Sequence, residues 1–155
     1  MKKLFILVSL FCLATFSYAQ DYNTGIGLRG GTASGLTIKH FVSGNAAVEG
    51  IISSRWEGVN LTGLYEIHNQ AFNEPGFNWY YGFGAHIGFW DGDHAHWNHD
   101  NSNHTVFGID GILGLEYNFR EIPINLSLDW KPALNIAGDS DFWGDNGALS
   151  IRFIF

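Results

Sequence analysis

The feature that most constrains this chain is a regular alternation of apolar residues with small or polar ones. Between Phe77 and Trp90, one set of alternate positions reads Phe, Trp, Tyr, Phe, Ala, Ile, Phe, and the other reads Asn, Tyr, Gly, Gly, His, Gly, Trp. Successive side chains of a β-strand point to opposite faces of a sheet, so this period of two indicates a strand with one apolar face. No segment shows a convincing helical period, and we therefore expect no helix.

The same alternation recurs along the chain and indicates eight strands. Many of the 20 glycines fall inside these segments. On the inner face of a narrow barrel, a glycine makes room for larger neighbouring side chains. The segments that carry the alternation are 25–29, 36–39, 48–52, 59–68, Phe77–Trp90, Thr105–Phe119, Ile124–Lys131 and Ala148–Phe155.

The apolar faces of these strands indicate a membrane environment. Apolar residues make up 46% of the chain, although no stretch after the N-terminal segment is long enough to span a bilayer as a helix. In a barrel that sits in lipid, alternate residues of each strand face the hydrocarbon and the others face the lumen. We therefore predict an all-β fold, an eight-stranded antiparallel up-and-down transmembrane β-barrel. With both chain ends in the periplasm, the longest connection, 91–104, faces outward, which agrees with the usual topology.

The first nineteen residues have the three parts of a secretory signal sequence. Two lysines precede the apolar run Leu4–Phe16, which is followed by Ser17-Tyr18-Ala19 as a cleavage site with small residues. The run is shorter than the roughly 20 residues that span a bilayer as a helix, which disfavours a retained anchor. We expect export, removal of residues 1–19, and a mature barrel domain of residues 20–155.

Charge and cysteine content narrow the possible partners and the chemistry. The formal net charge is −7, and it becomes −9 when the two lysines of the signal sequence are removed. This acidic balance argues against nucleic acid as a partner, because phosphate backbones are bound by basic surfaces. The single cysteine, Cys12, lies in the signal sequence, so the mature domain is expected to contain no disulfide.

The signal sequence, the aromatic-rich alternating strands and the C-terminal segment Leu149–Phe155 resemble the small OmpA/OmpX-type outer-membrane barrels of Gram-negative bacteria, the family of outer membrane protein β-barrel domains. The resemblance implies a location in the bacterial outer membrane, among its lipid and lipopolysaccharide. It also implies that Phe155, with alternating apolar residues before it, is the signal read by the barrel-insertion machinery. Since this family includes adhesins, structural tethers and enzymes, the resemblance does not choose a function.

The lumen face of the predicted strands collects charges of both signs. An eight-stranded barrel is too narrow for an open channel, and buried charges persist when they are paired and hydrogen-bonded. We therefore interpret these side chains as an ion-pair network that closes the lumen; a proton or ion pathway, or an acid/base pair, is the alternative. The predicted network comprises Arg29, Lys39, Glu49, Glu66, Asp110, Glu116, Asp129, Lys131 and Arg152.

The predicted outward connection Asp91–His104 is rich in metal-ligand residue types. It holds four of the seven histidines and three carboxylates, and these groups bind zinc, nickel or copper. The spacing matches no established zinc motif, so a solvated loop is the competing interpretation. No other cofactor is expected. The candidate ligands of a divalent transition metal are His94, His96, His99, His104, Asp91 and Asp93.

Aromatic side chains near strand ends suit the interfacial girdles of a membrane barrel, with a carbohydrate or ligand platform as the alternative. This expectation covers several positions in the second half of the chain. They are Trp79, Tyr80, Tyr81, Trp90, Trp97, Trp130 and Trp143.

The function that follows is a structural or surface-interaction role, with an unidentified extracellular partner at the outward loops, above all Asp91–His104. A lipid-modifying enzyme is one alternative. Deacylases on this fold place a histidine and a serine two residues apart, and Ser102 and His104 have that spacing in the opposite order, within the predicted loop. The other alternative is a soluble periplasmic barrel of lipocalin type, in which the apolar residues would face inward.

Overall fold

The computed structural model describes residues 22–55, 58–90, 104–137 and 141–155. The predicted signal sequence, residues 1–19, lies outside these ranges. The described residues form strands and turns, and among them there is no helix long and apolar enough to cross a membrane.

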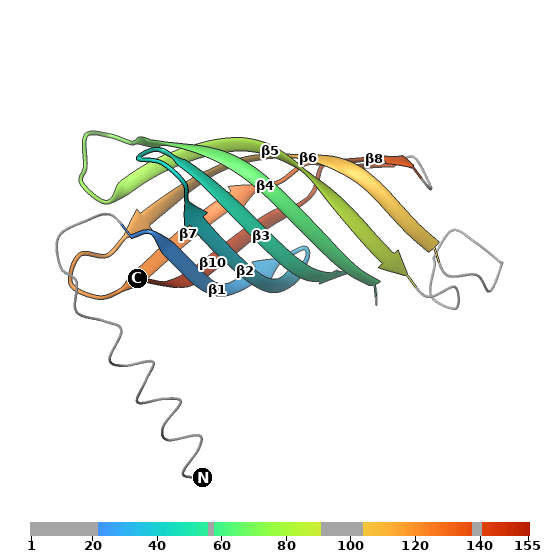
Figure 1. Ribbon diagram of the computed structural model, residues 1–155, viewed down its shortest axis with the longest axis horizontal. Helices are drawn as coiled ribbons and strands as arrows, with labels where there is room; N and C mark the ends of the chain where they lie inside the picture. Colours follow the sequence, from blue (N-terminus) through green and yellow to red (C-terminus); the bar gives the residue numbers. More distant parts are fainter. Residues whose placement is uncertain (1–21, 56–57, 91–103, 138–140) are drawn as a thin grey trace, which may run out of the picture.

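The strands form a closed antiparallel barrel with up-and-down topology, as predicted (Figure 1). Each of the first six strands pairs with the next, β6 pairs with both β7 and β8, β7 pairs with β10, and β10 pairs with β1, which closes the wall. The strands are β1 Thr24–Gly31, β2 Ser34–Phe41, β3 Ala46–Arg55, β4 Gly58–Gln70, β5 Phe77–Trp90, β6 His104–Asn118, β7 Ile124–Trp130, β8 Ala133–Ala137, β9 Phe142–Trp143 and β10 Gly147–Ile154.

The ten strand elements form eight wall strands, because the seventh and the eighth wall strands are each divided into two elements. Strands β7 and β8 follow one another along β6 and are separated by Lys131 and Pro132. Proline has no backbone N–H for the strand ladder; its carbonyl still accepts a hydrogen bond from the Gly111 backbone N–H at 2.9 Å. The predicted segment Ile124–Lys131 therefore covers β7 alone, and the wall continues through β8 to Ala137. Strand β9, which pairs with β8, lies where a connection was expected.

The other boundaries follow the sequence pattern closely. Strand β5 has the predicted ends, and β6 begins and ends one residue before the predicted segment Thr105–Phe119. The connection after β4 is closed by a hydrogen bond from the Ala71 N–H to the Phe77 carbonyl at 2.8 Å. Phe72 and Asn73 adopt positive φ angles of 53° and 54° in this connection.

The barrel has two ends that are easily distinguished. The terminal end holds both ends of the described chain, where the Asn23 and Thr24 N–H groups donate to the Phe155 carbonyl. The opposite end, the loop end, is where β1, β3, β5 and β8 end and where β2, β4, β6 and β10 begin (Figure 1).

Apolar side chains cover the outer face and polar ones fill the interior. Phe83, Leu28 and Leu128 expose 71%, 61% and 61% of their surface, and Leu113 is exposed as well, whereas Ile87 is half-buried. The largest fully buried side chains include Arg152, Tyr80 and Lys39. This distribution is the reverse of that in a soluble protein, where charged residues lie outside.

Glycine at position 114 is required by its neighbours inside the barrel. A Cβ atom there would lie 2.5 Å from Tyr80 Cζ and 2.6 Å from its hydroxyl oxygen. Since Tyr80 is fully buried, it has little room to move, and we expect Gly114→Ala to lower the free energy of unfolding by about 1–3 kcal/mol. Urea unfolding followed by tryptophan fluorescence measures this.

The matched control for that substitution is Gly63→Ala on the outer face of β4. A Cβ atom at Gly63 meets nothing within 4 Å, so this variant is expected to change the unfolding free energy by no more than about 0.5 kcal/mol. Equal unfolding curves for the two variants would contradict the tight packing of Tyr80 against β6.

Candidate functional site in the barrel interior

All nine predicted inward charges lie in the barrel interior, and each one takes part in at least one ion pair. Their side chains are between 0% and 8% exposed. Every second residue of a strand points inward, which is why residues distant in sequence gather in one column of charge. Three groups of these charges follow one another from the terminal end toward the loop end.

The group nearest the terminal end is organised around the Lys39 ammonium. Its Nζ atom lies 2.8 Å from Glu66, 3.6 Å from Glu49 and 3.8 Å from Glu116. The same atom lies 4.0 Å from the centre of the Tyr80 ring, within the range of a cation–π contact. One lysine therefore holds three carboxylates together.

Arg152 is the second cation of this group and the residue with the most hydrogen bonds in it. Its guanidinium donates to the carboxylate of Glu49 and, through Nη1, to Asn125 Oδ1 at 3.1 Å and to Ser127 Oγ at 2.7 Å. Its Nε atom donates to Thr37 Oγ1 at 3.3 Å. Such a complete set of partners is what a buried guanidinium needs to offset the loss of water.

His68 bridges two carboxylates at the same level. Its Nε2 atom lies 3.0 Å from Glu66 and its Nδ1 atom 3.0 Å from Glu116. Both ring nitrogens can donate only when the ring carries two protons. With that proton present, the five carboxylates of the predicted network face five cations.

Tyr22 closes the interior at the terminal end. Its hydroxyl donates to Glu116 at 3.3 Å, and the residue is 7% exposed. Burial and the nearby Glu116 carboxylate raise the pKa of Tyr22, so the phenol stays protonated and acts as a donor.

The middle group is a pair with two parallel hydrogen bonds. Arg29 donates to Asp129 through Nη1 at 2.7 Å and through Nη2 at 2.5 Å. The Tyr80 hydroxyl donates to the same carboxylate at 3.1 Å. The bidentate geometry and the third donor fix the position of the Asp129 side chain.

The group nearest the loop end is formed by Asp110, Lys131 and His86. Lys131 Nζ lies 2.7 Å from Asp110 Oδ1, and His86 Nδ1 lies 2.7 Å from Asp110 Oδ2. His86 Nε2 faces Asn135 Oδ1 at 2.9 Å. The Asp110 carboxylate thus has a partner on each oxygen.

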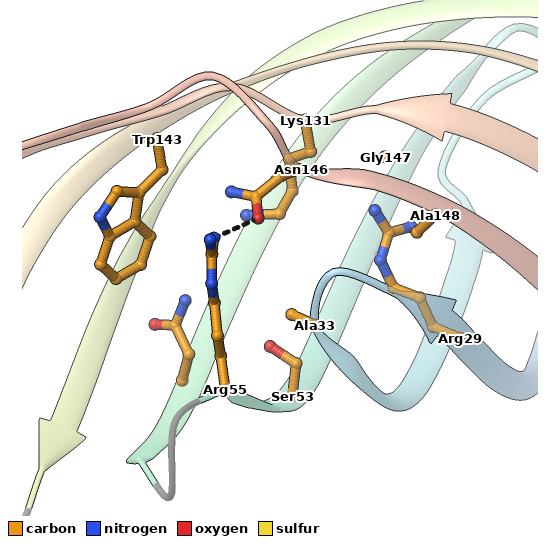
Figure 2. Close-up of a pocket in the computed structure, with 10 residues that line it drawn as sticks. Arg29, Ala33, Ser53, Arg55, Lys131, Trp143, Asn146, Gly147 and Ala148 are labelled. Carbon is orange, nitrogen blue, oxygen red and sulfur yellow. Dashed lines mark hydrogen bonds between the residues drawn. The ribbon is translucent and has the colours of Figure 1, made fainter. Parts of the chain in front are cut away.

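A small pocket opens above these groups at the loop end (Figure 2). Arg29, Arg55 and Lys131 contribute its basic groups, and Trp143 forms part of its wall. Figure 2 shows Arg55 reaching from β3 toward Asn146, to which its Nη1 atom donates at 2.8 Å. The Arg55 guanidinium also lies 5.2 Å from the Trp143 ring.

The predicted metal ligands lie almost wholly outside the described residues. Asp91, Asp93, His94, His96 and His99 belong to the segment 91–103. The remaining candidate, His104, is the first residue of β6. Within the described ranges, no group of three or more histidine, cysteine or carboxylate side chains is arranged to hold a metal ion.

Several interior residues were not assigned to the site from sequence. His68, Tyr80, His86 and Asn125 alternate onto the lumen face, so their position was predicted but their bridging role was not. Arg55 was missed because it adjoins a predicted loop.

The expectation of interfacial aromatic girdles is wrong for Trp143 and Tyr80. Trp143 is 6% exposed and Tyr80 is fully buried, so both side chains lie within the barrel. Trp79 and Trp130, by contrast, are exposed.

The sequence matches no family model and no curated protein. The geometry of the barrel interior and the composition of its outer face are therefore the basis for a functional proposal.

Proposed function

We propose that this protein is an outer-membrane β-barrel of the OmpA/OmpX type from a Gram-negative bacterium, exported by residues 1–19, with a structural or surface-interaction role and no catalytic one. The observation that carries the proposal is the inverted distribution of side chains. Phe83, Leu28 and Leu128 project from the wall, while charged residues such as Lys39 and Arg152 are fully buried inside it. Hydrocarbon is the solvent that stabilises such an outer face.

The ion pairs in the interior support a structural role in which the lumen does not conduct ions. Side chains from β1, β2, β3, β6, β7 and β10 pair across the lumen at successive levels. Moving an ion along this path would require separating buried pairs, each of which is costly to break. We infer that specificity belongs to the loop end, with residues 91–104 as the proposed contact segment for an extracellular partner and the candidate site for a divalent metal.

The lipocalin-type alternative is opposed by the same distribution. A soluble barrel that binds an apolar ligand needs apolar residues facing its cavity, and here Glu49, Glu66 and Arg152 occupy that space. For the lipid-modifying alternative, Ser102 lies outside the described residues, and nothing in the described ranges favours it. Lipid, lipopolysaccharide and the barrel-insertion machinery, through Phe155, remain the proposed partners.

The location is tested by expressing the full chain in a Gram-negative host and fractionating the membranes. We expect the protein to resist extraction by high salt and alkaline carbonate, to require detergent, and to migrate differently on gels before and after boiling, because the barrel stays folded in cold detergent. In planar bilayers, the purified barrel should give no steady channel current. Detergent without protein and the boiled sample are the controls.

Release by salt or carbonate alone would contradict the membrane location. A reproducible unitary current would contradict the closed interior while leaving the location intact. The two parts of the proposal therefore fail separately.

A further inference from the structure

The pocket at the loop end is lined by basic and neutral side chains. Among the described residues that line it, Arg29, Arg55 and Lys131 are basic and none is acidic. Arg29 is bound to Asp129 and Lys131 to Asp110 within the barrel. Arg29 and Lys131 thus pair with carboxylates inside the barrel, whereas Arg55 pairs with Asp145 at the loop end.

One partner of Arg55 is a carboxylate that is largely exposed to solvent. Arg55 Nη2 lies 3.0 Å and 3.2 Å from the two oxygens of Asp145. The Arg55 side chain is only 7% exposed, whereas that of Asp145 is 67% exposed. Since an ion pair with a solvated partner contributes little, another oxyanion can replace Asp145 at modest cost.

The rest of Asp145 is held independently of its side chain. Its backbone carbonyl accepts hydrogen bonds from Thr32 Oγ1 at 2.8 Å and from the Gly147 N–H at 2.9 Å. The carboxylate can therefore leave the guanidinium without moving the chain that carries it. The Asp145 side chain can thus be displaced while the Arg55 guanidinium keeps its hydrogen bond to Asn146.

Neutral polar groups complete the pocket. Ser53, Asn60 and Asn146 line it. Asn60 is 7% exposed, and its Oδ1 atom is buried with no hydrogen-bond partner among the described residues. Buried polar atoms are nearly always paired, so this amide points to a ligand group or water that carries a donor.

An aromatic ring of the pocket wall lies beside the Arg55 guanidinium. The guanidinium lies against the Trp143 ring, and Trp143 is itself fixed by a hydrogen bond from Nε1 to Asp141 Oδ2 at 3.1 Å. A planar guanidinium held in this way is preorganised for two-point binding of a carboxylate or phosphate.

We propose that the loop-end pocket binds a single oxyanion group, a carboxylate or phosphate, which displaces Asp145 from Arg55 and is contacted by Lys131, Ser53 and Asn146. A protonated phosphate or the hydroxyl group of a larger ligand supplies the donor for Asn60. The small size of the pocket admits one such group, either from a free anion or from the end of a larger molecule such as a lipopolysaccharide phosphate.

The test is calorimetric titration of the full barrel in detergent with inorganic phosphate at constant ionic strength. We expect saturable binding of one phosphate per protein. Arg55→Gln should weaken it by about tenfold or more, since it removes a charge-assisted contact. Asp145→Asn should strengthen it, because the competing carboxylate is gone. Arg120→Gln, a change of the same kind at an exposed turn near the terminal end, should leave it unchanged.

The source of the oxyanion is distinguished by repeating the phosphate titration after saturation with lipopolysaccharide. Loss of the phosphate signal assigns the pocket to a lipopolysaccharide phosphate, and retention assigns it to a free anion. Absence of saturable phosphate binding to the unmodified protein overturns the inference. If Arg55→Gln does not fold, Asp145→Asn decides, and an unchanged affinity overturns it. Membrane extraction is independent of these results, so the proposed location does not fail with the pocket.

Discussion

Replacing Arg152 by methionine is expected to lower the free energy of unfolding by about 3–5 kcal/mol, because it removes a buried cation and leaves the buried Glu49 carboxylate with only part of its compensating charge. Arg152 is fully buried and hydrogen-bonds to Thr37, Glu49, Asn125 and Ser127. Methionine replaces the part of the side chain up to Nε and removes the charged guanidinium. Glu49 then retains Lys39 at 3.6 Å as its nearest cation, while Lys39 is shared with two other carboxylates.

The unfolding free energy is measured by urea titration in phospholipid vesicles, followed by tryptophan fluorescence. Arg120→Met, at an exposed turn, is the matched control and should differ from the unmodified protein by no more than about 0.5 kcal/mol. The double variant Arg152→Met with Glu49→Gln should recover part of the loss, because it removes the stranded carboxylate. A loss below about 1 kcal/mol for Arg152→Met, the range of a surface pair, would contradict the network.

The sequence pattern was sufficient to identify the fold because each strand has only two faces. Alternation placed Phe83 outside and Arg152 inside, and the structure has them so. It also placed all nine network residues on the lumen side. These assignments require only knowing whether a residue is at an odd or an even position of its strand, and the local sequence shows that.

The partners within the network could not be predicted in the same way. Which charges meet depends on the stagger between strands and on the reach of each side chain across the lumen. Lys39 lies beside Glu49 in the strand register but closer to Glu66, which is on β4. Arg29 and Asp129 lie on β1 and β7, which are separated by β10. Sequence separation carries no information on such cross-lumen contacts.

The loop-end pocket was missed for a different reason. Pro132 interrupts the alternation, so the pattern assigns no strand to the residues just beyond it, although β8 lies there, and it predicts a connection where β9 lies. Trp143 and Asn146 consequently had no predicted face. Arg55, next to a short connection, had no assigned role. The residues of this pocket lie at strand ends and near the interruption at Pro132, where the alternation of faces says least about the direction of a side chain.

Introducing arginine at Phe83 is the second substitution with a large expected effect. Phe83 lies midway along β5, projects from the outer wall and is 71% exposed. If this face meets hydrocarbon, Phe83→Arg should lower the unfolding free energy in phospholipid vesicles by about 2–4 kcal/mol, the cost of placing a cation near the bilayer midplane. The measurement is the same urea titration, and Phe83→Ala controls for the loss of the ring and its contact with Tyr65.

The difference in unfolding free energy between the arginine and alanine variants shows whether the outer wall faces water or lipid. On a water-exposed face, arginine is tolerated and the difference should lie within about 0.5 kcal/mol; in lipid, arginine should be the worse of the two by a clear margin. Leu128→Arg, on β7 and 61% exposed, repeats the test on another strand. In a soluble protein, charged residues lie mostly on the outside. In this barrel, we expect both Arg152→Met, which removes a charge from the interior, and the two arginine substitutions, which add one to the exterior, to lower the unfolding free energy. Only a barrel with lipid outside and paired charges inside accounts for both losses.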